Sequence, residues 1–128
     1  MPLIDRMKQK LIDWLMRERS PHVFPLCDFE RIRYEIRPCD VLLEEGFSRV
    51  SHVIKQITQS PWSHAMLFIG RLNDIDNPLL RERVSQFYDG DPNDQLVIES
   101  LLGKGTIVTA LSAYKDAHIR ICRPKNIS

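Results

Sequence analysis

Apolar residues recur every three or four positions between Pro2 and Arg19, with charged residues between them. This spacing predicts an amphipathic helix, because positions three and four apart lie on one helical face. Pro2 suits a first helical turn, and the Ser20–Pro21 pair ends the segment. The apolar stripe consists of Leu3, Ile4, Met7, Leu11, Trp14 and Leu15.

Two roles for this stripe stay open. An amphipathic helix usually packs its apolar face on its own domain. The segment also carries more basic than acidic residues, and Trp14 suits a bilayer interface. A peripheral membrane or protein contact through residues 3–15 is therefore the alternative.

The rest of the chain alternates short apolar runs with polar segments. Residues 21–38 contain three prolines and predict an extended connector, with a short turn over residues 28–31. Ser48 caps a predicted helix that stops at Ser60–Pro61, and the polar residues 71–95 form an excursion with a helical turn over residues 79–87. The apolar runs predict strands at Val41–Glu44, His64–Gly70, Leu96–Ser100, Thr106–Leu111 and Ile119–Arg123.

These elements predict an α+β fold in which N-terminal helices pack on a small antiparallel β-sheet. The short glycine connection at residues 103–105 favours antiparallel neighbours. We expect residues 1–20 to form an N-terminal helix and residues 21–128 to form one domain.

Composition narrows the class of protein. The chain has 128 residues, of which 43% are hydrophobic and 27% charged, so one domain with a real core is expected. The net charge of +1 gives no field that would attract nucleic acid. No stretch is long and apolar enough for a membrane span, and the N-terminus lacks the pattern of a secretory signal, so we expect a cytoplasmic protein.

Motifs for metals and nucleotides are missing from the sequence. It has no His-Glu-x-x-His, Cys-x-x-Cys or Gly-x-Gly-x-x-Gly pattern, and the segment Gly103–Thr106 lacks the residues of a phosphate loop. His22, His52 and His118 are most simply surface or capping residues. We expect neither a metal nor an organic cofactor.

Two ionisable residues stand in apolar strands. His64 opens one strand, and Glu99 lies inside another. Burying such a group costs free energy unless it is paired or solvated in a cleft. A histidine whose ring is held by a carboxylate is the base half of a nucleophilic triad, although each residue alone is more often structural.

Residues 37–70 resemble the permuted papain-like cysteine amidases of the YaeF/YiiX group, which are related to NlpC-type peptidases and lecithin retinol acyltransferase. The resemblance rests on the Asp40-Val41 strand start, the Thr-Gln-Ser-Pro-Trp-Ser-His segment and the apolar strand ending at Gly70. It continues through Val97-Ile98-Glu99-Ser100 to about Pro124. The resemblance implies a cysteine-dependent hydrolase or acyltransferase acting on a peptide, amide or acyl ester, with His64 as general base and Glu99 orienting it.

The nucleophile is the open question. The resemblance places it on a helix after the last strand, beyond the point where this chain stops at Ser128, so we expect the domain to be incomplete at that end. Of the chain's own thiols, Cys39 stands where the group usually has glycine and Cys122 alternates with apolar strand residues, so both are interpreted as structural. Cys27 is the remaining candidate nucleophile. The alternatives are a thiol from a longer chain or partner, or an inactive binding or scaffold module.

Overall fold

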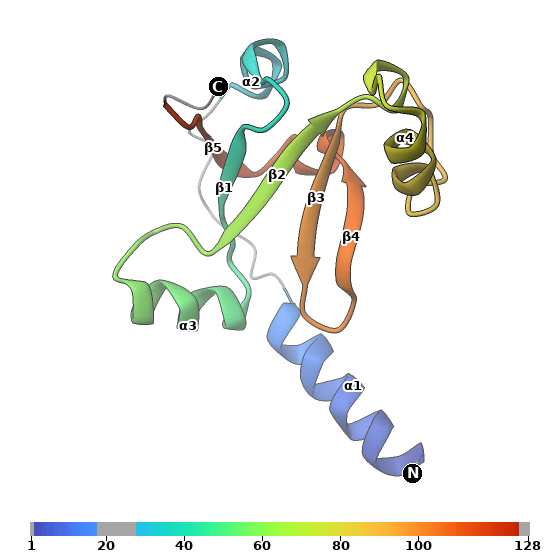
Figure 1. Ribbon diagram of the computed structural model, residues 1–128. Helices are drawn as coiled ribbons and strands as arrows, with labels where there is room; N and C mark the ends of the chain where they lie inside the picture. Colours follow the sequence, from blue (N-terminus) through green and yellow to red (C-terminus); the bar gives the residue numbers. More distant parts are fainter. Residues whose placement is uncertain (1, 18–27, 126–128) are drawn as a thin grey trace.

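The computed structural model describes residues 2–17 and 28–125 and has an α+β fold (Figure 1). Its five strands form one antiparallel sheet in the order β4-β3-β2-β1-β5. The strands are β1 (Val41–Glu45), β2 (His64–Gly70), β3 (Leu96–Leu101), β4 (Gly105–Ala110) and β5 (His118–Cys122). All five strand predictions are confirmed to within a residue or two at their ends.

The helices surround this sheet. They are α1 (Pro2–Met16), α2 (Phe29–Glu35), α3 (Arg49–Thr58) and α4 (Pro78–Ser85), with the short 3-10 helices η1 (Leu72–Asp74) and η2 (Leu111–Tyr114). Ser48 caps α3 as predicted, its hydroxyl accepting a hydrogen bond from the Ser51 backbone N–H at 3.1 Å. Asn77 caps α4 in the same way. The fold class is therefore the one that the hydrophobic pattern predicts.

One prediction is wrong in the connector. Residues 29–35 form the regular helix α2, where the sequence predicted an extended segment with a turn. Asp28 caps this helix, and Phe29, Ile32 and Ile36 pack on the main core cluster. Their spacing of three and four residues is helical, so burial of this face outweighs the influence of the flanking prolines.

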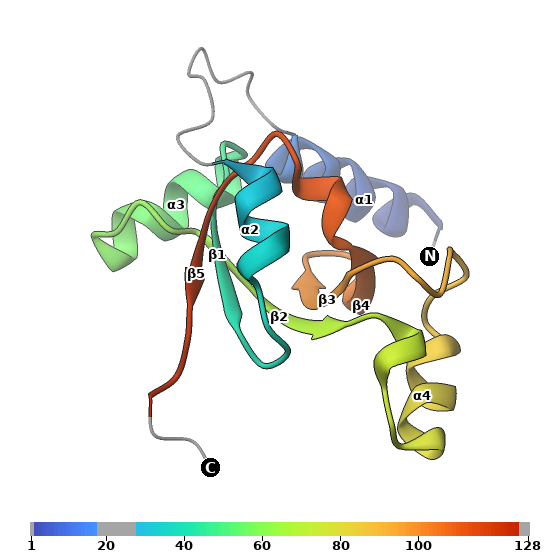
Figure 2. The ribbon, with the colours of Figure 1, turned by 90° about the horizontal axis from the view of Figure 1, so that it is seen from above.

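The main core lies on one face of the sheet. Side chains alternate between the two faces of a strand, and the register places Leu42 and Glu44 on the same face as Met66 and His64. Leu42, Met66, Phe68 and Val97 are fully buried there beneath α2 and η2 (Figure 2). An ionisable group next to these residues is therefore at least partly removed from water.

Helix α1 makes few contacts with the rest of the molecule. It meets α3, where the Arg49 guanidinium donates to the Trp14 carbonyl at 2.9 Å and lies 4.2 Å from the centroid of the Trp14 ring. Ile12 lies against Gly103 in the β3–β4 turn. No residue of α1 is buried, and among the described residues no helix is both long enough and apolar enough to cross a membrane.

Candidate functional site

The structure brings His64 and Glu99 together. The Nε2 atom of His64 lies 2.9 Å from Oε1 of Glu99. The β2–β3 register pairs Leu67 with Ile98, so Glu99 lies diagonally across from His64 on the core face of the sheet. Two residues that are 35 positions apart in the sequence thus form a pair because their strands are hydrogen-bonded neighbours.

Glu99 is buried and held as a carboxylate. Its side chain has no exposed surface, and Oε1 accepts hydrogen bonds from both His64 and the hydroxyl of Tyr114. Burial is the largest influence on the pKa of Glu99 and raises it, but the hydrogen bonds from His64, Tyr114 and Thr109 together lower that pKa below its usual value. Among the described residues, no group makes a geometrically good hydrogen bond to Oε2.

The carboxylate of Glu99 orients the His64 ring and makes it a stronger base. The hydrogen bond to Glu99 raises the pKa of His64, burial opposes this shift, and the charges of Glu99 and Glu44 add to it. Because Nε2 donates to the carboxylate, the neutral ring carries its proton on Nε2 and leaves Nδ1 as the acceptor. The side chain is 19% exposed, so the ring is partly accessible while its partner is not.

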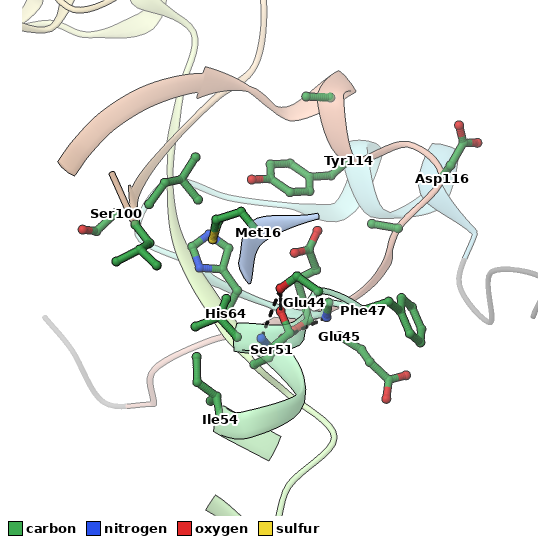
Figure 3. A pocket seen from close by; sticks show the side chains of 18 residues that line it. Met16, Glu44, Glu45, Phe47, Ser51, Ile54, His64, Ser100, Tyr114 and Asp116 are labelled. Carbon is green, nitrogen blue, oxygen red and sulfur yellow. Dashed lines mark hydrogen bonds between the residues drawn. The ribbon is translucent and has the colours of Figure 1, made fainter. Parts of the chain in front are cut away.

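His64 lines a cavity of about 480 Å³ (Figure 3). The walls come from the end of α1, the β1–α3 loop, the first turns of α3, the end of β3 and the η2–β5 segment. They are mainly apolar, and their charged residues other than His64 are all acidic. The apolar lining residues include Met16, Phe47, Ile54 and Leu101, and the acidic ones include Glu44 and Asp116.

Small residues form the wall between β1 and α3. The Gly46 backbone N–H donates to the Ser63 hydroxyl at 2.8 Å, and the hydroxyls of Ser48 and Ser51 lie 2.8 Å apart. A Cβ atom at Gly46 would lie only 2.5 Å from the Ser51 hydroxyl oxygen. This close packing fixes the residue before His64 and thereby the start of β2.

The structure gives the positions of two of the three cysteines, and both are far from His64. The Cys39 backbone N–H donates to the Phe68 carbonyl, and Cys122 pairs with Val41, so both lie at the other end of the sheet from His64. Phe68 lies four positions along β2 from His64, about 13 Å at the usual rise per strand residue. Cys27 lies outside the described residues.

Of the other histidines, His52 and His118 do not line this cavity. His52 is exposed on α3, and His118 lies 3.3 Å from Glu45 and against the ring of Trp62. His22 lies outside the described residues. Within the described part of the chain, no three His, Cys, Asp or Glu side chains are arranged to hold a metal ion.

Two contributors to the site were not identified from the sequence. Tyr114 reaches Glu99 from η2, a short segment without a helical or strand period of its own. Glu44 faces His64 directly across the β1–β2 register. A signal for Glu44 existed, because an acidic residue on the core face of an apolar strand is as unusual as Glu99 itself.

Comparisons with family models, curated proteins and solved structures gave no match to this chain. The resemblance to permuted papain-like amidases therefore stays a prediction from the sequence.

Proposed function

We propose that this chain carries the base half of a cysteine-dependent acyl-transfer site, in which His64 is the general base and Glu99 orients it. The observation that supports this most is the 2.9 Å contact between His64 Nε2 and the buried Glu99 Oε1, with His64 also lining a cavity. A buried carboxylate that fixes the tautomer and stabilises the imidazolium is what a thiol–imidazole pair needs.

The chemistry follows from the tautomer. Nδ1 of His64 accepts the thiol proton, and the sulfur forms a bond to the carbonyl carbon of an amide or ester. When the tetrahedral intermediate collapses, the C–N or C–O bond breaks and the imidazolium returns the proton to the leaving amine or alcohol. Water or another acceptor then attacks the thioester carbonyl while Nδ1 removes its proton, and the C–S bond breaks to release the thiolate, which takes this proton back from the imidazolium.

The conformation of Cys39 supports the resemblance on which this proposal draws. Cys39 has a φ of 77°, in the left-handed region that favours glycine. The resembled amidases usually have glycine at this position, so the backbone keeps a conformation suited to the residue that this chain lacks.

The cavity walls narrow the kind of substrate. An apolar lining favours an acyl group with hydrocarbon character, because its burial is favourable. The acidic Glu44 and Asp116 disfavour an anionic group beside His64. An uncharged or cationic acyl compound fits these walls better than a peptide carboxylate or a phosphate.

A second candidate function has one observation in its favour. Neither Cys39 nor Cys122 lines the cavity. If Cys27 does not react with His64 either, the same cavity is the site of a binding or scaffold module.

Thiol alkylation distinguishes these two functions. If Cys27 is the nucleophile, iodoacetamide should label it faster than a free peptide cysteine at neutral pH, because an imidazole beside a thiol lowers its pKa. His64→Ala should slow this labelling, whereas Cys39, at the far end of the sheet, should react at the same rate in both proteins. Peptide mapping separates the three rates.

His52→Ala is the matched control, since His52 is exposed on α3 and does not line the cavity. It should leave all three rates unchanged. Labelling of Cys27 at the rate of an ordinary peptide thiol, unaffected by His64→Ala, would exclude catalysis by the chain's own cysteines and favour the binding module.

A further inference from the structure

Helix α1 exposes its apolar stripe to solvent. Leu3 is 69% exposed, Met7 63% and Leu11 56%, and Ile4 and Trp14 are each about half exposed. Solvent exposure of one large apolar side chain is ordinary, but a contiguous row along a helix marks a contact surface. Of the two roles that the sequence left open, packing on the domain leaves most of this stripe uncovered, since only Leu15 of its six residues is half-buried.

Apart from Arg49, which lies over the Trp14 ring, the contacts of α1 with the domain lie on another side of the helix. Ile12 touches the β3–β4 turn, and Met16 lines the His64 cavity. At roughly 100° per residue, these two positions point away from the arc that holds Leu3, Met7 and Trp14. The first turns of α1 project beyond the β3–β4 hairpin, as Figure 1 shows. A flat surface can therefore reach the exposed arc.

Charges are sorted around this helix. Basic residues of α1 flank the apolar arc on both sides, whereas its two acidic residues, Asp5 and Asp13, lie toward the far side, where Gln9 donates to Asp13 at 2.9 Å. The flanking basic residues of α1 are Lys10 and Arg6 on one side and Lys8 on the other. Basic side chains at the borders of an apolar face can reach anionic headgroups while the apolar residues enter the acyl region.

We propose that α1 lies in the plane of an anionic lipid surface, with Leu3, Met7, Leu11 and Trp14 inserted. A second copy of the chain is a poorer occupant, because pairing two such faces brings their basic borders together and leaves the acidic residues outside. At 15 residues, α1 is too short to span a bilayer and suited to lie on it. Because Met16 ends α1 and also lines the cavity, the docked helix holds the His64 site close to the surface.

Vesicle co-sedimentation tests this proposal without any measurement of activity. The full chain should sediment with vesicles of phosphatidylcholine and phosphatidylserine, and much less with phosphatidylcholine alone or at high salt. Met7→Glu and Leu11→Glu should each weaken binding to the mixed vesicles about tenfold or more, because a large apolar side chain no longer enters the membrane.

Gln9→Glu is the matched control, since it makes the same change of charge on the far side of the helix from the apolar arc. It should weaken binding less than Met7→Glu does. Both positions are exposed, so neither variant should change the urea unfolding midpoint.

Three results would overturn the proposal. These are no sedimentation with phosphatidylserine vesicles, equal loss of binding in Met7→Glu and Gln9→Glu, and a concentration-dependent dimer that Met7→Glu dissociates. The last result would assign the face to a second copy. None of them bears on thiol reactivity, so the proposed function stands or falls separately.

Discussion

Two buried carboxylates belong to the same sheet, Asp40 at one end of the strands and Glu99 bonded to His64, which starts β2 at the other end, and their surroundings differ. Asp40, just before β1, and Glu99, in β3, are each only 2% exposed. Both oxygens of Asp40 are hydrogen-bonded, to Arg123 Nε at 2.9 Å and Nη2 at 2.8 Å, and to the Arg37 backbone N–H at 2.9 Å. Glu99 instead concentrates two donors on Oε1.

This difference shows that burial of a carboxylate does not by itself identify a functional residue. Asp40 joins the start of β1 to the residue after β5, and its partner Arg123 lies outside the cavity. Glu99 holds a histidine that can itself gain and lose a proton near neutral pH. We interpret the Asp40 end as a structural ion pair and the Glu99 end as the site.

Replacing each carboxylate by its amide tests this interpretation. Asp40→Asn should lower the free energy of unfolding by about 2 kcal/mol, since it removes charge-assisted hydrogen bonds from a buried group. Glu99→Gln should cost less than Asp40→Asn at neutral pH, because its amide oxygen can still accept from both His64 and Tyr114, although its buried amide nitrogen has no partner at the Oε2 position. Urea unfolding at neutral pH measures both.

Asp74→Asn is the control, since Asp74 is an exposed residue 3.8 Å from Arg71 and should have almost no effect on stability. Equal losses in Asp40→Asn and Glu99→Gln would contradict the distinction between the two ends.

The two ends should also respond to pH in opposite directions. The Arg123 hydrogen bond is the main reason that the pKa of Asp40 lies below its usual value of 3.8, although burial opposes it. A folded-state pKa below the unfolded value stabilises the protein above the unfolded pKa, and this stabilisation is lost as the pH falls through the folded pKa. Asp40→Asn should therefore lose less stability than the wild type between about pH 5 and pH 2.

The pKa of His64 is raised, so the sign of its contribution is reversed. Its stabilisation is present below the unfolded value near 6.5 and is lost as the pH rises through the folded pKa. Glu99→Gln should lower the pKa of His64, because the hydrogen bond to the carboxylate is the main cause of the shift. NMR titration of the histidine ring protons measures this pKa, which Asp40→Asn should not change.

The sequence predicted the sheet better than it predicted the contacts of either carboxylate. Runs such as Leu96–Ser100 predict strands because short segments rich in β-branched and other apolar residues occur mostly in strands. The period of two also places Glu99 on the same face as buried Val97. Its contact with His64 depends on the β2–β3 register, which comes from the whole sheet, so only the family resemblance paired the two residues in advance.

Contacts between distant segments could not be predicted in this way. Asp40 and Arg123 are 83 positions apart, and Tyr114 reaches Glu99 from a 3-10 turn without periodicity. Helix α2 was missed because seven residues give too few turns for a clear period between prolines. Each of these features is determined by packing on the sheet, which local sequence does not encode.

Cys39→Gly tests the backbone conformation of the residue before Asp40. With a φ of 77°, Cys39 adopts a conformation that costs an ordinary residue about 1–2 kcal/mol. Glycine removes this cost but gains freedom in the unfolded chain, so we expect a net stabilisation of about 0.5–1 kcal/mol. Urea unfolding should show a higher midpoint with the same slope, and a lower midpoint would mean that the thiol makes a stabilising contact.

Glu44→Gln tests whether Glu99 alone, or Glu44 as well, raises the pKa of His64. Glu44 acts on His64 through space from the facing position of β1, and its charge is the weakest of the influences that raise the pKa of His64. The variant should therefore lower the pKa of His64 by less than Glu99→Gln does, and should leave the hydrogen bond between His64 and Glu99 in place. NMR titration of both variants under the same salt conditions compares the two effects. A larger decrease in Glu44→Gln would make Glu44 the dominant partner of the base, and the Glu99 end would then resemble the Asp40 end more closely than its geometry implies.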